Sequence, residues 1–135
     1  RRVPCEHGEI ARFAKSRNPI NHMTVCYRKS AVLAVGNYQH APLYEDYDLW
    51  VRMLLNGCRF ANLPEVLVYA RAGDEMYRRR GGWAYAKNEL AMQLRFYRAG
   101  FLSAAQWAKN VLLRLPVRLL PNGVRQWVYR VLLRK

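Results

Sequence analysis

Acidic residues are absent from the last third of this 135-residue chain. Residues 90–135 contain nine lysines and arginines and no aspartate or glutamate, whereas residues 1–89 contain 14 basic and all nine acidic residues. The net charge of +14 is therefore concentrated toward the C-terminal end. A basic segment of this kind favours a polyanionic partner, namely nucleic acid, anionic lipid or a phosphorylated substrate.

Cysteine and long apolar runs are also scarce. Cys5, Cys26 and Cys58 are odd in number and far apart, which gives neither a disulfide framework nor a Cys-x-x-Cys metal site and favours a reducing compartment. No apolar run approaches the roughly 18 residues of a membrane-spanning helix, so we expect this chain not to cross a membrane by itself. Hydrophobic residues nevertheless make up 52% of the sequence, which excludes a disordered chain.

The hydrophobic periodicity predicts a helix-rich chain with a few short strands. Helices are predicted from apolar spacing, caps and stop signals at 8–17, 31–35, 45–56, 83–99, 103–115 and 124–133. Strands are predicted from β-forming residues at 22–28, 58–62 and 65–71. Residues 66–69 are continuously apolar, a pattern typical of a buried strand.

Three carboxylates occupy four positions where the helix over 45–56 is predicted to begin, namely Glu45, Asp46 and Asp48. The helix dipole and the free backbone N–H groups of a first turn stabilise acids there, so ordinary capping is one interpretation. Capping needs one acid, however, and neighbouring like charges repel. The acids that capping does not require would be explained if one carboxylate of the cluster accepts a proton from an attacking hydroxyl group. This chemistry alone does not say which of the three acids is that carboxylate.

Four stretches of the sequence together resemble family-2 glycosyltransferases, in particular bacterial enzymes that build exopolysaccharide or lipopolysaccharide sugars. They begin Asn-Pro-Ile-Asn-His at residue 18, Gly-Asn-Tyr at 36, Glu-Asp-Tyr-Asp-Leu-Trp at 45 and Phe-Ala-Asn-Leu-Pro at 60. Each stretch alone is weak, but their order and spacing over residues 18–72 are specific.

This resemblance implies a fold, a reaction and a base. The fold is the C-terminal, acceptor-side part of the α/β GT-A fold, with that half-domain at 1–100 and a basic amphipathic helical tail at 101–135. The reaction is inverting transfer of a sugar from a nucleotide-sugar donor to a glycan or polyprenyl-linked acceptor in surface polysaccharide synthesis. Asp46 corresponds to the catalytic base, Glu45 contacts the acceptor or orients the base, and Asp48 caps the helix.

The same resemblance implies that a donor-binding half precedes Arg1. That half carries the family's Asp-x-Asp motif, so we expect a divalent metal, Mg²⁺ or Mn²⁺, to be bound mainly there, and the isolated chain to be inactive. A histidine of the family that often binds the metal also lacks a counterpart, because Gly73 stands near its place and no histidine follows His40. We therefore assign no metal ligand within this chain.

An arginine-rich loop precedes the helix predicted at 83–99. Arg71, Arg78, Arg79, Arg80 and Trp83 are its candidate ligand-binding residues. Because guanidinium groups match phosphate oxygens, this loop is predicted to cover the diphosphate of the donor. A solvated basic loop is the alternative.

The last 33 residues combine apolar helix faces with flanking lysines and arginines. This pattern predicts either packing against the core or an interfacial anchor on an anionic membrane, which would place the protein in the cytoplasm at the inner face of the cytoplasmic membrane. Two other functions compete with sugar transfer: a basic helical nucleic-acid-binding module and a non-catalytic scaffold at the membrane surface. The first does not explain the acid cluster, and no nucleic-acid-reading motif is present, so we expect no nucleic-acid partner.

Overall fold

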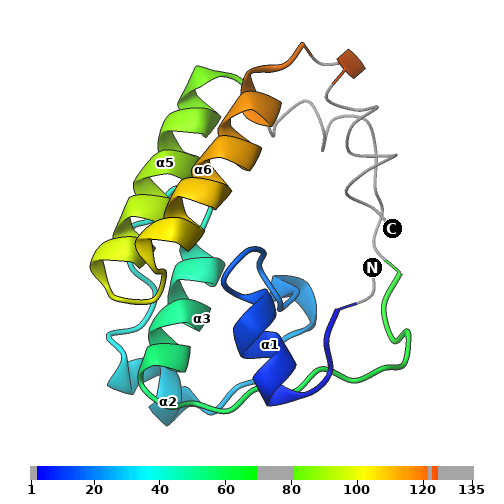
Figure 1. The fold of residues 1–135 in the computed structure, drawn as a ribbon. Coiled ribbons are helices and arrows are strands. Elements are labelled where there is room, and N and C mark those ends of the chain that lie inside the picture. The colour runs from blue at the N-terminus through cyan, green and yellow to red at the C-terminus, as the bar shows by residue number, and fades with distance from the viewer. Residues whose placement is uncertain (1–2, 70–80, 122, 125–135) are drawn as a thin grey trace.

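The structure is a computed structural model that describes residues 3–69, 81–121 and 123–124. Its helices are α1 (His7–Phe13), the 3₁₀ helix η1 (His22–Thr24), α2 (Lys29–Ala34), α3 (Glu45–Leu55), α5 (Trp83–Arg98) and α6 (Ala104–Leu119). In Figure 1, α5 and α6 lie side by side, and α1 and α2 gather around α3. None of these helices is both long enough and apolar enough to span a bilayer.

The helices predicted around residues 8–17, 31–35, 45–56 and 83–99 are all present, with ends shifted by a few residues. Their boundaries follow local signals. Gly57 adopts a φ of 78° directly after α3, a left-handed conformation that glycine adopts without strain. The local sequence therefore defines these elements well. The helix predicted at 124–133 lies almost entirely outside the described residues.

Helix α6 begins where predicted but runs past its predicted end at residue 115. Ser103 Oγ accepts the Gln106 N–H at 3.2 Å, and Gln106 Oε1 accepts the Ser103 N–H at 3.0 Å, which forms a capping box. Pro116 lies inside the helix although it lacks an N–H to donate. The final turn is held instead by Arg118, whose side chain is buried in ion pairs with α5.

The three predicted strands are absent from the described part of the chain, so only the helix-rich character of the predicted fold class is confirmed. Residues 22–28 begin as η1 rather than as a strand. Residues 66–69, predicted to be buried, have side chains that are between 52% and 93% exposed. A strand is stabilised by a hydrogen-bonded neighbour, and no described segment pairs with this one.

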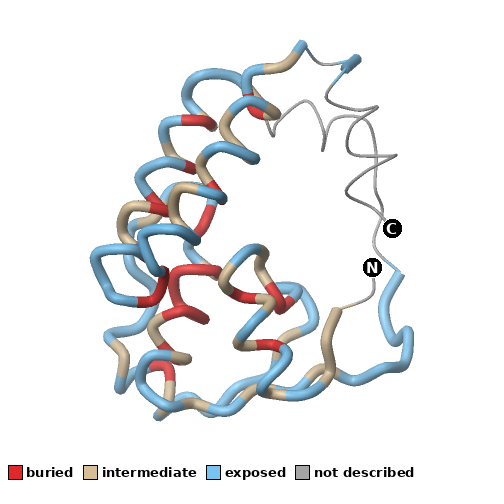
Figure 2. Tube along the Cα trace, in the orientation of Figure 1, coloured by how far each residue is buried: buried red, intermediate tan, exposed pale blue. Residues whose placement is uncertain are grey.

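Helix α3 lies at the centre of the core and contributes to two hydrophobic clusters. The first cluster comprises Ala14, Tyr44, Tyr47, Val51, Met92, Phe96, Phe101 and Leu102. The second comprises Ile20, Val32, Leu49, Trp50 and Met53. Figure 2 shows that the longest buried stretch of the described chain lies in α3. Because α3 packs on both sides, its first turn is held in a fixed position.

A buried ion-pair network joins α6 to α5. The Glu89 carboxylate is fully buried and binds Arg118 Nη2 at 2.7 Å, the Arg114 guanidinium, and Tyr44 Oη, which donates to it at 2.6 Å. Burial alone would raise the pKa of Glu89, but the two guanidinium groups and the Tyr44 hydroxyl lower it to about 2.

Phe101 and Leu102 also join the first core cluster. The division of the chain at residue 100 stays a prediction.

Candidate functional site

The half-buried carboxylate of Asp46 is held in a defined orientation at the start of α3. Asn18 Nδ2 donates to Asp46 Oδ2 at 2.9 Å, and the Tyr47 backbone N–H donates to Asp46 Oδ1 at 2.7 Å. A carboxylate has about four lone-pair sites, so each oxygen keeps the capacity to accept another hydrogen bond. Asp46 is therefore both fixed by its neighbours and accessible to a ligand.

Asn18 is itself oriented by the backbone that follows it. Its Oδ1 atom accepts the Ile20 N–H at 3.1 Å, which leaves the Nδ2 amide to point at Asp46. Pro19 lies between these residues and restricts the backbone of Asn18 to an extended conformation. Asn18 opens the first stretch that carries the family resemblance, and this is the signal by which its role could have been found from sequence.

The other two acids of the cluster have different environments. The Glu45 side chain is exposed at the first position of α3. Asp48 is buried, and its Oδ2 and Oδ1 atoms lie 2.8 Å from Arg52 Nε and 2.9 Å from Arg95 Nε, respectively. The prediction that Asp48 caps the helix is wrong, since both of its carboxylate oxygens pair with arginines and the first-turn N–H of Tyr47 is bound by Asp46 instead. The ion pairs of Asp48 instead connect α3 to α5.

An aromatic group that the sequence motifs did not single out lies near Asp46. Burial, a hydrogen bond to Tyr27 and the nearby charges of Tyr27 and Asp46 raise the pKa of Tyr38 to about 12. The His22 ring packs edge-on against Tyr38, with 5.9 Å between ring centroids. All three of these residues stand in the stretches that resemble the family, but single aromatic residues in a sequence give no sign of lying together.

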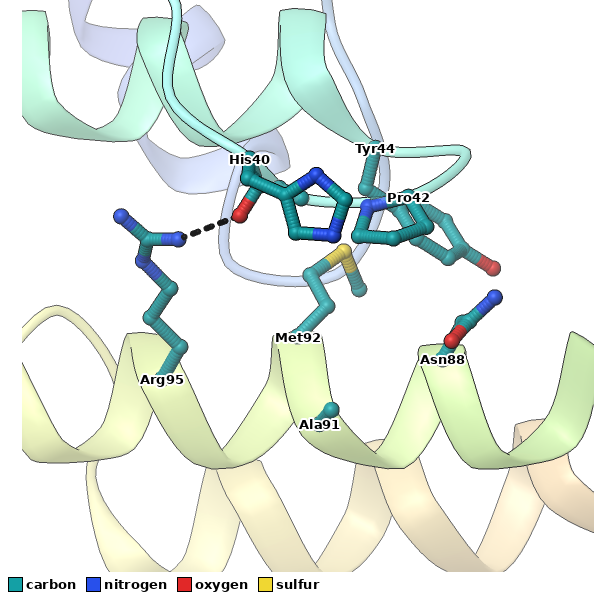
Figure 3. Close-up of a pocket in the computed structure, with 8 residues that line it drawn as sticks. His40, Pro42, Tyr44, Asn88, Ala91, Met92 and Arg95 are labelled. Atoms are coloured by element: carbon teal, nitrogen blue, oxygen red, sulfur yellow. Dashed lines mark hydrogen bonds between the residues drawn. The ribbon is translucent and has the colours of Figure 1, made fainter.

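A small pocket lies on the α5 side of the loop that leads into α3. In Figure 3, His40, Pro42 and Tyr44 face α5 residues including Met92 and Arg95, and the Arg95 guanidinium donates to the His40 carbonyl oxygen at 3.3 Å. Its volume of about 110 Å³ is well below the several hundred Å³ typical of ligand pockets. None of the three clustered acids lines it, so it is separate from the Asp46 site.

The predicted diphosphate-binding residues are only partly described. Arg71, Arg78, Arg79 and Arg80 lie outside the described residues, and their role stays a prediction. Trp83 is the first residue of α5, and its side chain is 81% exposed. In the described ranges, no three histidine, cysteine or acidic residues come close enough to hold a metal ion.

Comparison with known proteins gives three related sequences. The chain is 39% identical over 135 residues to the UDP-Gal:alpha-D-GlcNAc-diphosphoundecaprenol beta-1,3-galactosyltransferase of Escherichia coli, covering all of this chain and 49% of that protein. It is 39% identical over 132 residues to the amylovoran biosynthesis glycosyltransferase AmsE of Erwinia amylovora, covering 96% of this chain and 48% of AmsE. It is 42% identical over 135 residues to an uncharacterized glycosyltransferase of Haemophilus influenzae, covering all of this chain and 50% of that protein.

The chain thus spans about half the length of the curated relatives it matches. No protein-family model matches the chain, and no solved structure matches it significantly.

Proposed function

We propose that this chain, related over its whole length to about half of each of three bacterial glycosyltransferases, is the acceptor-side part of such an enzyme. The identity of 39–42% over at least 96% of the chain is the observation that carries this proposal. The finer assignment is to an inverting family-2 enzyme with the GT-A fold. Two relatives are named for a diphosphoundecaprenol-linked sugar and for amylovoran biosynthesis, which supports a nucleotide-sugar donor and a lipid-linked or glycan acceptor.

Asp46 is the proposed general base. As the acceptor hydroxyl oxygen bonds to the anomeric carbon of the donor, its proton passes to the Asp46 carboxylate. The bond from that carbon to the diphosphate oxygen breaks, and the nucleoside diphosphate leaves with the electron pair. Attack on the side opposite the leaving group inverts the anomeric configuration. The half-exposed carboxylate held by Asn18 and Tyr47 supports this role, because a base must be positioned and yet within reach of the hydroxyl.

Glu45 is the proposed acceptor-binding residue. Of the two roles that the family resemblance implies, contact with the acceptor is better supported than orientation of the base. The Glu45 side chain is exposed, and Asp46 is already oriented by Asn18 and the Tyr47 N–H. An exposed carboxylate next to the base is suited to accept hydrogen bonds from the other hydroxyl groups of an acceptor sugar.

Donor binding is proposed to depend largely on residues outside the described ranges. We propose that Mg²⁺ or Mn²⁺ is bound mainly by the part of the enzyme beyond this chain, which spans about half the length of its relatives. Such an ion would neutralise charge on the leaving diphosphate. Arg71, Arg78, Arg79 and Arg80 are proposed to bind the diphosphate, with Trp83 at the start of α5 as the exposed edge of that site.

The outer face of α6 is the proposed membrane contact. Leu112 and Leu113 are 73% and 62% exposed, whereas Arg118 on the inner side is buried in the Glu89 network. Residues 90–135 carry nine basic and no acidic residues, which complements an anionic lipid surface at the inner face of the cytoplasmic membrane. Exchange of both leucines for serine should weaken binding of the full-length protein to phosphatidylglycerol vesicles without unfolding α6. Unchanged binding would contradict this assignment.

The transferase proposal is tested by turnover in the full-length protein. A panel of nucleotide sugars that includes UDP-galactose is offered with a short-chain lipid diphosphoryl N-acetylglucosamine as acceptor. Asp46→Asn should lower kcat by about 10²- to 10⁴-fold, the usual contribution of a general base. Glu9→Gln is the control, because Glu9 is likewise an acid in the first turn of a helix, and its side chain is exposed.

The outcomes separate the competing functions. Normal turnover by Asp46→Asn would contradict its assignment as base. Absence of turnover with every donor, together with binding to duplex DNA that weakens steeply with salt, would favour a nucleic-acid-binding module instead. Vesicle binding without any turnover would favour a membrane-surface scaffold.

A further inference from the structure

We infer that His22, Tyr27 and Tyr38 form a stacking subsite for the acceptor sugar ring beside Asp46. This inference rests on the proposed function and deepens it, because it assigns the surface that holds the acceptor against the base.

Tyr27 and Tyr38 lie on the Asp46 side of α3. Asp46 and Trp50 are four residues apart on α3, so they lie on the same face of the helix. The Tyr27 ring packs against the Trp50 ring with 6.0 Å between centroids. The Tyr38 ring lies near Tyr27, which contributes to the raised pKa of Tyr38. The two tyrosines therefore lie along the helix face that carries the proposed base.

The segment that contains Asn18 and His22 also connects Asp46 to the aromatic group. Asn18 binds Asp46, and four residues later His22 packs edge-on against Tyr38, at 5.9 Å between centroids. The segment that orients the base thus also contacts the aromatic group.

The two tyrosine rings are held in place by their neighbours and are partly exposed. Trp50 is fully buried and supports the group from the core, whereas Tyr27 and Tyr38 are 42% and 38% exposed. Tyr27 is held by its contact with Trp50 and Tyr38 by its contact with His22, so binding to them would order few side-chain torsions. The group is a pre-organised, partly exposed aromatic surface.

Such a surface matches a sugar ring in its chemistry. A pyranose presents C–H groups on its faces and hydroxyl groups on its edge, while tyrosine and histidine present an apolar ring and a polar tip. A base must touch the hydroxyl that attacks, so the sugar nearest Asp46 is that of the acceptor and not of the donor. We therefore assign the aromatic surface to the acceptor.

The test separates acceptor binding from donor binding in the full-length enzyme. Tyr38→Ala should raise the KM for the short-chain lipid diphosphoryl N-acetylglucosamine about tenfold, the scale of a good aromatic contact, and change the donor KM less than twofold. Tyr38→Phe keeps the ring and should retain most of the affinity. Tyr97→Ala is the matched control, because Tyr97 is 42% exposed, close to the 38% of Tyr38, and packs against the ring of Trp107 at 5.9 Å.

A binding measurement accompanies the kinetics. In the full-length Asp46→Asn protein, saturation of aromatic protons should transfer to the sugar C–H protons of the same probe, and the additional change Tyr38→Ala should abolish the transfer. An unchanged acceptor KM, a rise confined to the donor KM, or an equal effect of Tyr97→Ala would each overturn the subsite. Absence of transfer activity in the wild-type enzyme would instead contradict the proposed function, so the two failures are distinguishable.

Discussion

Glu89 offers the sharpest test of how α6 is attached to the rest of the molecule. Its carboxylate is fully buried between the guanidinium groups of Arg114 and Arg118, and it accepts a hydrogen bond from Tyr44. Glu89→Gln keeps nearly the same shape and removes the negative charge. Arg114 and Arg118 then lose the carboxylate that neutralises their charge, and Arg118 is itself buried. The substitution should therefore destabilise the fold through lost charge pairing rather than through lost volume.

The magnitude follows from the pKa of Glu89, which the native structure lowers from 4.5 to about 2. At about 1.4 kcal/mol per pH unit, this lowering corresponds to about 3 kcal/mol of stability at neutral pH. Removal of one partner from a buried pair typically costs about 3–5 kcal/mol, which agrees. Because the pKa is depressed in the folded state, the contribution is complete above pH 4.5 and disappears as the pH falls toward 2.

The assay is urea unfolding followed by circular dichroism, for the parent chain, Glu89→Gln and the exposed control Glu65→Gln. At pH 7 we expect Glu89→Gln to lose about 3 kcal/mol of unfolding free energy and the control to change by less than about 0.5 kcal/mol. The difference between the parent and Glu89→Gln should shrink as the pH falls from 4.5 toward 2. A loss below about 1 kcal/mol at pH 7, or a difference that does not depend on pH, would refute the reasoning.

Two further predictions concern the base and the α6 cap. Asn18→Ala removes the amide that orients Asp46 and should lower kcat of the full-length enzyme about tenfold with little change in the acceptor KM, accompanied by an altered pH profile of kcat; a rise in KM alone would argue against positioning. Ser103→Ala removes half of the capping box and should cost about 1 kcal/mol in urea unfolding, whereas Ala104→Ser next to it serves as the control; equal effects would contradict a specific cap.

Much of the helical structure could be predicted because its signals are local. The apolar spacing of α3 and α5, the glycine after α3 and the serine before α6 all act within one or two helical turns. The end of α6 could not be predicted in this way. Pro116 signals a stop, but the ion pair of Arg118 with Glu89, 29 residues away in sequence, retains a further turn.

The prediction of the three strands was wrong for a related reason. A run of β-forming residues at 66–69 shows that the segment can be extended, but pairing and burial depend on a neighbouring strand that no local pattern specifies. In the described chain this segment has no regular secondary structure and is exposed. Its apolar side chains would be covered if a further part of the enzyme packed there, in keeping with a chain that spans about half the length of its relatives.

For the site, the sequence by itself determined that three acids gather at a helix start and that basic charge accumulates toward residue 135. Only the tertiary structure decided what each acid does. It buried Asp48 between Arg52 and Arg95, left Glu45 exposed, and set Asp46 against an amide 28 residues away in sequence. The physical reason is range: capping and periodicity act between near neighbours, whereas burial, ion pairing and the aromatic surface beside Asp46 arise from contacts that only the packed chain brings together.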